Sequence, residues 1–341
     1  MTQFKSAALI VNAQSRRGQA MFEEACAALK GLPFPVDAHA VEKPDKLEPT
    51  LKKALSKKPE LVILGGGDGT ISGLVDLLVG KDVVMGVLPL GTANSFCRTL
   101  GIPLDVPGAV AVLNDGVRKR IDLGMIGDDY FANAATLGIA PKIAETVPHG
   151  LKKVLGRAGY LTWAAYQYAK FRPFKVTVTP KGEAPTTIKC VEVRIANGRF
   201  HGGQELMETA AVDSGEIVIE CVRGHFKRRL IANWAANLLR LPSRREDVVE
   251  FHAKELRLDS AKPLPISIDG EVLAHTPVTA KVADDVIDVM VPAAPSPSAS
   301  ASRPARNRRA PASPPSPPPP SRRTARPAAR RATRPSGNKR R

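Results

Sequence analysis

Residues 61–70 have the sequence LVILGGGDGT, in which four glycines and one carboxylate follow an apolar run. The apolar residues 61–64 are typical of a strand buried on both faces of a parallel sheet. Thr70 is expected to cap a helix over residues 71–79. Glycines between a strand and a helix let backbone N–H groups approach an anion closely. The stretch predicts a phosphate-binding loop formed by Gly65, Gly66, Gly67, Gly69 and Thr70, although such a glycine turn can also serve tight packing alone.

Asp68 is the unusual member of this loop, because a carboxylate repels phosphate. We expect it to act indirectly, through Mg²⁺ or by orienting another polar group. The loop lacks the Lys-Ser/Thr ending of a Walker sequence, so the sequence does not belong to that class of ATPase.

The first third of the chain repeats a strand–loop–helix pattern. A strand over residues 7–11 ends at Asn12 and precedes a helix over 20–29, and a strand over 83–88 ends in PLGTAN at 89–94. Three such units predict a parallel sheet with helices on its faces. Ligands bind at the carboxyl ends of such strands, so we expect one nucleotide-binding edge that also includes Gly91, Thr92 and Asn94.

The sequence pattern changes after about residue 122. Short strands are expected at 174–178, 188–195, 216–221, 256–258, 265–268 and 278–282, with helices over 151–171 and 226–241. The predicted fold class is α/β plus β: a parallel-sheet nucleotide-binding domain at 1–121 and an antiparallel, β-rich domain at 122–282. A last strand within 283–292 could return to the first domain.

Residues 293–341 differ in composition, being rich in Pro, Ala, Ser and Arg and lacking acids. They hold 13 of the 17 net positive charges, so the rest of the chain carries +4. We expect a disordered tail that meets anionic membranes or, without sequence specificity, nucleic acid. The four cysteines are scattered and are expected to be reduced. The N-terminus has no signal-peptide pattern and no apolar run is long enough to span a bilayer, which predicts a cytoplasmic protein.

Candidate carboxylates stand in three further places. Asp269 lies in ISIDGEV at 266–272, where Asp-Gly between alternating apolar residues is typical of a hairpin turn. Alternatively, Asp269, or Glu271 in reserve, is a general base that accepts a proton from a substrate hydroxyl. Asp122 fits either a strand start or the lining of a cleft, whereas Asp213 lies in a sequence that is typical of a turn.

These motifs resemble the diacylglycerol kinase catalytic domain family, which includes bacterial lipid kinases and sphingosine and ceramide kinases. The similarity runs from Asn12 to Glu271, and the block PLGTANSF at 89–96 distinguishes it from NAD kinases, which share GGDGT. The resemblance implies a nucleotide-binding domain and a lipid-binding domain with the active site between them. It also implies transfer of the ATP γ-phosphate to a lipid hydroxyl, with Mg²⁺.

The resemblance also assigns roles to individual residues. It implies that residues 66–70 hold the ATP phosphates, that Asn12 and Thr92 lie at the nucleotide, and that Asp269 is the base. Asp122 matches an acidic position near the active site. The family's structural metal site usually has an Asp where this chain has Ser214, which leaves Asp213, one position earlier, as the candidate ligand.

The predicted function is therefore that of a lipid kinase that works peripherally at the inner face of the membrane. A NAD-kinase-like enzyme with a soluble substrate is one alternative. A nucleic-acid-binding protein with a degenerate kinase body is another. The sequence does not distinguish diacylglycerol from a sphingoid base or ceramide as the acceptor.

Overall fold

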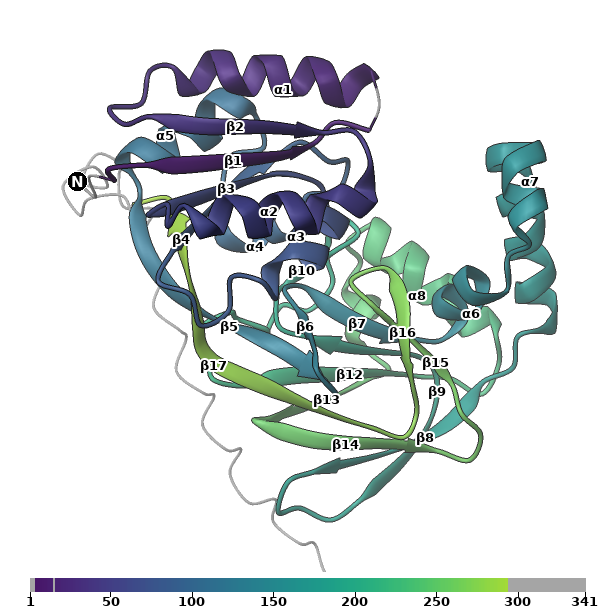
Figure 1. The fold of residues 1–341 in the computed structure, drawn as a ribbon. Coiled ribbons are helices and arrows are strands. Elements are labelled where there is room, and N and C mark those ends of the chain that lie inside the picture. The colour runs from purple at the N-terminus through teal and green to yellow at the C-terminus, as the bar shows by residue number, and fades with distance from the viewer. Residues whose placement is uncertain (1–3, 15, 294–341) are drawn as a thin grey trace, which may run out of the picture. The chain divides into compact units, whose positions relative to one another are not determined.

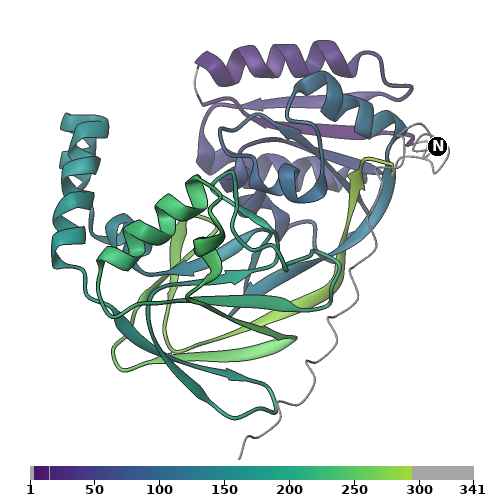
Figure 2. The same ribbon diagram turned by 180° about the vertical axis from the view of Figure 1, so that it is seen from behind.

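A computed structural model describes residues 4–14 and 16–293 (Figure 1). Residues 294–341, nearly all of the predicted tail, lie outside the described residues. The described chain contains a parallel α/β domain followed by a β-rich domain, as Figure 2 shows from behind. The predicted fold class of these two domains is confirmed.

The first domain is built on four parallel strands in the order β4-β3-β1-β2. Their bounds are Ala7–Asn12 (β1), Val36–Val41 (β2), Leu61–Gly66 (β3) and Val84–Pro89 (β4). Every residue of β3 and β4 is buried, which confirms that the apolar run is covered on both faces. Asn12, Gly66 and Pro89 end neighbouring strands and so bring their loops to one edge.

Helices pack on this sheet in two pairs, α1 with α5 and α2 with α3. The helices are α1 (Arg16–Leu29), a 3₁₀ turn η1 (Pro44–Lys46), α2 (Leu47–Ser56), α3 (Asp68–Val75), α4 (Ser95–Leu100) and α5 (Val106–Asp115). Two predictions about α3 were wrong. The helix starts at Asp68 rather than residue 71, and its cap is Gly67, whose carbonyl accepts the N–H groups of Thr70 and Ile71.

The second domain is a mostly antiparallel sheet in the order β16-β15-β7-β9-β8-β14-β17. Strand β12 also pairs with β9 and carries β13 on its other side, and β5 pairs with β17 and carries β6. These strands are β5 (Val117–Ile126), β6 (Asp129–Phe131), β7 (Ala134–Leu137), β8 (Phe174–Pro180), β9 (Thr186–Ala196), β12 (Ile217–Arg223), β13 (Val248–Ala253), β14 (Glu255–Ser260), β15 (Pro265–Ile268), β16 (Glu271–His275) and β17 (Val278–Val291). A separate hairpin consists of β10 (Phe200–His201) and β11 (Gln204–Glu205). The remaining helices are α6 (Ile139–Thr146), α7 (His149–Lys170), α8 (Arg228–Leu238) and the 3₁₀ turn η2 (Pro242–Arg245).

Strand β17 connects the two domains. Two separate strands were predicted here, but one long strand pairs antiparallel with β14 and β5 and then parallel with β4. Its register shifts between Ala283 and Ile287, where Asp285 has a φ of 52°. The bend redirects the strand, so residues 288–289 lie beside β4 of the first domain.

All four cysteines are free, and three of them are buried. Burial raises the pKa of the Cys97 thiol to about 12, so it stays protonated. Within residues 4–14 and 16–293, no helix has both the length and the apolar character needed to cross a membrane.

Candidate active site

The three loops at the carboxyl ends of β1, β3 and β4 line one hollow of about 510 Å³. Its lining includes Asn12, Gly66, Gly67, Thr70, Gly91 and Thr92, six of the residues predicted for nucleotide binding. Asn12 Nδ2 lies 3.4 Å from Thr70 Oγ1, which joins the first loop to the second. The hollow therefore has the backbone N–H groups and hydroxyls that an anion requires.

Glycines let two of these loops approach backbone to backbone. A Cβ atom on Gly91 would lie 2.3 Å from Gly67 Cα, and one on Gly66 would lie 2.5 Å from the Thr70 side chain. Any larger residue at Gly91 would force the β3–α3 and β4–α4 loops apart. The glycines are thus required by the contact between the loops as well as by access to a ligand.

Asn94 shapes its own loop. It has a φ of 47° and is only 6% exposed. Its Oδ1 accepts the Gly91 N–H at 2.9 Å, and its Nδ2 donates to the carbonyls of Gly91 at 3.0 Å and Pro89 at 3.3 Å. Thr92, two residues earlier, lines the hollow instead.

Asp68 lies at the junction of the two domains. Its Oδ1 accepts the Phe96 N–H at 3.0 Å and lies 3.5 Å from Asn133 Nδ2 of the second domain. The carboxylate thus ties the first turn of α3 to α4 and reaches across the junction. This arrangement fits the expected indirect role, because Asp68 makes these contacts outside the lining of the glycine-loop hollow.

Asp269 occupies the turn between β15 and β16 with a φ of 44°, so the hairpin interpretation of DG is correct. The same side chain is also bound from the junction. Its two oxygens accept the N–H groups of Ala132 at 2.9 Å and Ala134 at 3.0 Å, and the Ser72 hydroxyl hydrogen-bonds to it. Burial, reinforced by the negative charge of Asp68, raises the pKa of Asp269 to about 6 despite these hydrogen bonds.

Sequence analysis missed Ser72, which hydrogen-bonds to Asp269, and Asn133, which approaches Asp68. Ser72 lies four residues after Asp68 on α3, a spacing that places both on one helix face and could have indicated it. Asn133 sits between the two alanines that bind Asp269, in a segment with no motif of its own. Asn197 supports that segment by donating to the Ala132 carbonyl at 3.3 Å.

Two further titratable residues differ in their surroundings. Glu271, the reserve base, is exposed at the start of β16. His201 lies partly buried in β10, where burial lowers the pKa of its imidazole, so the ring is neutral at pH 7.

Asp122 lies in β5, next to β17, and contacts the turn that contains Asp213. The buried Asp122 carboxylate accepts the N–H groups of Gly215 and Asp285, each at 2.8 Å. Asp213 Oδ2 is 2.7 Å from Lys119 Nζ, and the Ser214 hydroxyl donates to the Ala211 carbonyl at 2.9 Å. Across the described part of the chain, no three His, Cys, Asp or Glu side chains lie close enough to hold a metal ion. Asp213 is thus paired with an ammonium group, and its role as a metal ligand stays a prediction.

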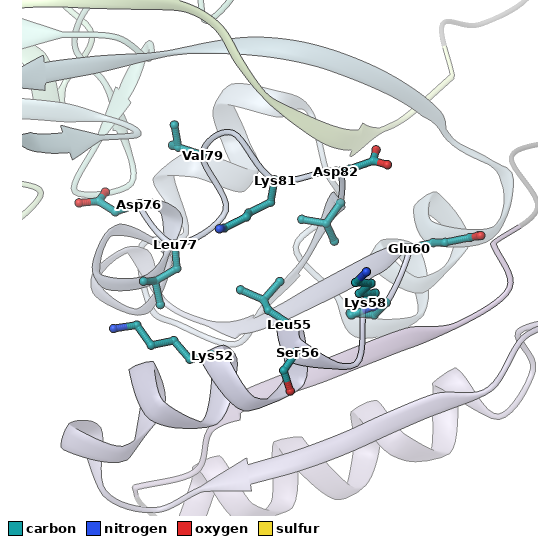
Figure 3. A pocket seen from close by; sticks show the side chains of 12 residues that line it. Lys52, Leu55, Ser56, Lys58, Glu60, Asp76, Leu77, Val79, Lys81 and Asp82 are labelled. Atoms are coloured by element: carbon teal, nitrogen blue, oxygen red, sulfur yellow. The ribbon is translucent and has the colours of Figure 1, made fainter.

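A second hollow, of about 910 Å³, lies at the opposite, amino ends of β3 and β4. Figure 3 shows Lys52, Lys58 and Lys81 among its lining side chains, together with Leu55 and Leu77. It lies away from Asp68, Asp269 and the glycine loop, and Asp76 and Glu60 offset its positive charges. The residues of the sequence motifs thus lie at the carboxyl ends of the parallel strands, away from this second hollow.

Comparison with known proteins gives matches in both domains. The family described as "Diacylglycerol kinase catalytic domain" matches residues 6–126, and the "YegS C-terminal NAD kinase beta sandwich-like domain" matches residues 134–291. A protein of Chromohalobacter salexigens named "Probable lipid kinase YegS-like" is 31% identical over 220 residues, which covers 63% of this chain and 70% of the relative. A "Diacylglycerol kinase" of Staphylococcus aureus is 25% identical over 84% of this chain and 93% of its own.

The fold also matches a solved structure. The crystal structure of a diacylglycerol kinase from Bacillus anthracis superposes with a TM-score of 0.64 at 20% identity, covering 85% of this chain and 98% of that one. At this identity, the match concerns the fold alone. The sequence matches span both domains and include the glycine loop and the Asp269 hairpin. This chain therefore belongs to the diacylglycerol kinase family of lipid kinases.

Proposed function

We propose that this protein transfers the γ-phosphoryl group of ATP to a hydroxyl group of a membrane lipid. The observation that carries the proposal is the position of Asp269, a carboxylate with a pKa of about 6 that faces the domain of the glycine loop. A general base with this pKa is ionised at pH 7 and still able to accept a proton. The phosphate-binding loop and the base thus lie on opposite sides of one junction.

In the proposed reaction, the backbone N–H groups of the glycine loop and the Thr70 and Thr92 hydroxyls hold the triphosphate. Asp269 accepts the proton of the lipid hydroxyl as the oxygen attacks the γ-phosphorus. The Ala132 and Ala134 N–H groups fix the carboxylate before the substrate arrives. Catalysis then consists of positioning and electrostatic stabilisation.

Mg²⁺ fits the junction. Asn133 Oδ1 is buried and has no hydrogen-bond partner among the described residues. The Nδ2 atom of the same amide lies 3.5 Å from Asp68 Oδ1. Oxygen ligands of this kind are those that Mg²⁺ prefers. Asp68 and Asn133 would hold the ion, which supplies positive charge opposite the phosphoryl group being transferred.

The lipid acceptor is supported by the family and by its relatives, one named a diacylglycerol kinase and another named as a lipid kinase. The proposed setting is the inner face of the membrane, with the basic residues 293–341 as one contact with anionic lipid. That contact is a prediction from composition alone.

Incubation with γ-labelled ATP, Mg²⁺ and a total lipid extract tests the proposal. We expect a labelled lipid whose identity gives the acceptor, and labelling that is lower by a factor of about 10² or more with Asp269→Asn at equal concentration. NAD serves as the soluble acceptor in a parallel reaction. Labelling of NAD without labelling of lipid would replace this function with the NAD-kinase alternative.

A further inference from the structure

Two helices of the second domain bury amide side chains and expose apolar ones. In α8, Asn233 is 1% exposed and accepts a hydrogen bond from Arg194 Nη2 at 3.0 Å, whereas Leu238 is 68% exposed and Leu239, directly after the helix, is 65% exposed. In α7, Gln167 is buried and donates to Thr146 Oγ1 at 2.9 Å, whereas Leu161 is 62% exposed. A helix that faces water should show the opposite pattern. The outer sides of α7 and α8 are therefore suited to a medium less polar than water.

The exposed apolar side chains of these helices and of the residues that flank α8 are called the α7–α8 face. They are Leu161, Tyr166, Phe226, Ile231, Trp234, Leu238, Leu239 and Leu241. Lys227 Nζ, just before α8, donates to the Ala169 carbonyl of α7 at 2.7 Å, and Figures 1 and 2 both draw α7 and α8 on the same side of the second domain. A gathering of exposed apolar side chains of this kind marks an interaction site.

The charge around the α7–α8 face is mainly positive. Residues 146–182 and 221–245 contain fourteen Lys and Arg and no Asp or Glu. Two acidic side chains from outside these ranges contact the helices: Glu192 accepts a hydrogen bond from Trp234 Nε1 at 3.2 Å, and Asp247 pairs with Arg229. Arg223, Arg228 and Arg240 are exposed beside the apolar residues of α8. An apolar surface with a basic margin complements a bilayer with anionic headgroups. A second copy of the same face would instead bring like charges together.

The face also lies beside the elements that carry the base. Helix α6 packs against α7 and against both strands of the β15–β16 hairpin, in whose turn Asp269 lies. His275 Nε2 of β16 lies 2.8 Å from Glu145 Oε1 of α6. A bilayer that binds to α7 and α8 would thus bring its lipid headgroups close to the domain that contains Asp269.

We propose that the α7–α8 face docks the protein on an anionic lipid bilayer, with Leu238 and Leu239 among the acyl chains and Arg228 and Arg240 at the headgroups. This inference rests on the proposed function, because it assigns the surface through which the kinase reaches its lipid. It is separate from the predicted contact of the basic tail, which would leave α8 in water.

Tryptophan fluorescence distinguishes these two contacts in the full chain. The protein has two tryptophans, Trp163 in α7 and Trp234 in α8, and Trp163→Phe leaves Trp234 as the only reporter. Vesicles containing brominated phosphatidylglycerol should quench Trp234 and shift its emission to the blue, in this variant and in the wild type. Unquenched fluorescence from protein that sediments with the vesicles would overturn the proposal and leave the contact elsewhere in the chain.

Substitution of the inserted side chains provides a second test. The full-length double variant Leu238→Gln/Leu239→Gln should bind phosphatidylglycerol vesicles at least about tenfold more weakly, because two apolar side chains no longer leave water. Leu104→Gln, a matched change at a 40% exposed leucine of the first domain, should bind like the wild type. Equal affinity of the double variant and the wild type would contradict the proposal.

Further measurements distinguish membrane docking from the proposed kinase function and from self-association. The double variant should keep wild-type turnover of short-chain diacylglycerol dispersed in detergent, which needs no docking. Vesicle binding without phosphorylation of any lipid by the wild type would contradict the proposed function and leave the docking surface intact. A wild-type dimer that the double variant converts to a monomer would show a self-association face, and docking would be wrong.

Discussion

Asp269 and Asp122 make the same local contacts in two regions of the molecule. Each carboxylate accepts two backbone N–H groups from segments distant in sequence: Ala132 and Ala134 for Asp269, Gly215 and Asp285 for Asp122. Their surroundings differ. Asp269 lies near the second carboxylate of Asp68, whereas the turn beside Asp122 contains the ion pairs Lys119–Asp213 and Lys254–Asp284.

The difference shows how one binding arrangement can serve two purposes. Two N–H donors hold each carboxylate in place. For Asp269, burial, reinforced by the charge of Asp68, raises the pKa despite these donors, which suits a base. In the Asp122 turn, lysines satisfy the neighbouring carboxylates, and the bound side chain joins β17 to the turn at Gly215.

Asp269→Asn should have the largest effect on activity. The amide cannot accept a proton, and we expect turnover to fall about 10²- to 10⁴-fold, the usual contribution of general base catalysis. ATP affinity should change little, because Asp269 lies outside the glycine-loop hollow. Steady-state kinetics and ATP titration measure the two quantities, and near-normal turnover would show that Asp269 is not the base.

The pH dependence of turnover should report the ionisation of Asp269. Asp269 must be ionised to act, so kcat/KM should fall about tenfold per pH unit as the pH drops below about 6, the pKa of this carboxyl. Asp68→Asn removes a negative charge that raises this pKa, so the acid limb should move to lower pH. If the acid limb of the pH profile stays at the same pH in Asp68→Asn, the charge of Asp68 does not affect the pKa of Asp269.

Asp122→Asn should act on stability rather than on chemistry. An amide can accept one of the two N–H groups but turns its own NH₂ toward the other, which leaves a buried donor unpaired. We expect the free energy of unfolding to fall by about 1–3 kcal/mol. Urea denaturation measures the loss, with the exposed Asp213→Asn as the control. If the folded Asp122→Asn variant lost turnover 10²-fold, Asp122 would act in the chemistry as Asp269 does, and the proposed difference between the two aspartates would be wrong.

The sequence predicts the fold class well because the signals are local. The apolar runs of β3 and β4 and the glycines that follow them indicate a parallel sheet. Strand β2, with the sequence VDAHAV, was missed because it has a half-exposed, polar pattern at the sheet edge. Strand β16 was missed for a similar reason, since exposed and half-buried residues alternate along it.

The site is harder to predict from the sequence because its contacts join residues that lie far apart in the chain. Spacing alone favoured a hairpin at Asp269 and left a general base as the alternative, which the family resemblance then supported. The partners Ala132 and Ala134 lie more than 130 residues away and have no distinctive side chains. Asn94 was predicted at the nucleotide because the motif contains it, whereas its amide is engaged by its own loop.

The smallest expected effects concern the turn beside Asp122. Lys119→Met removes the partner of Asp213 in a pair whose side chains are 39% and 50% exposed. Exposed pairs contribute about 0.2–1 kcal/mol, so the free energy of unfolding should fall by no more than that. The same variant leaves Asp213 without its cation and therefore asks whether the turn can use a metal instead.

Chelation completes this test. In the wild type, the Lys119 ammonium already neutralises Asp213 and the Ser214 hydroxyl donates to a carbonyl, so EDTA should leave the Tm unchanged. A Tm lowered by EDTA and restored by Mg²⁺ in the absence of nucleotide would contradict this assignment. A response to Mg²⁺ confined to Lys119→Met would instead show that the lysine occupies the role of the cation, because an ion that stabilises only the folded state raises the Tm.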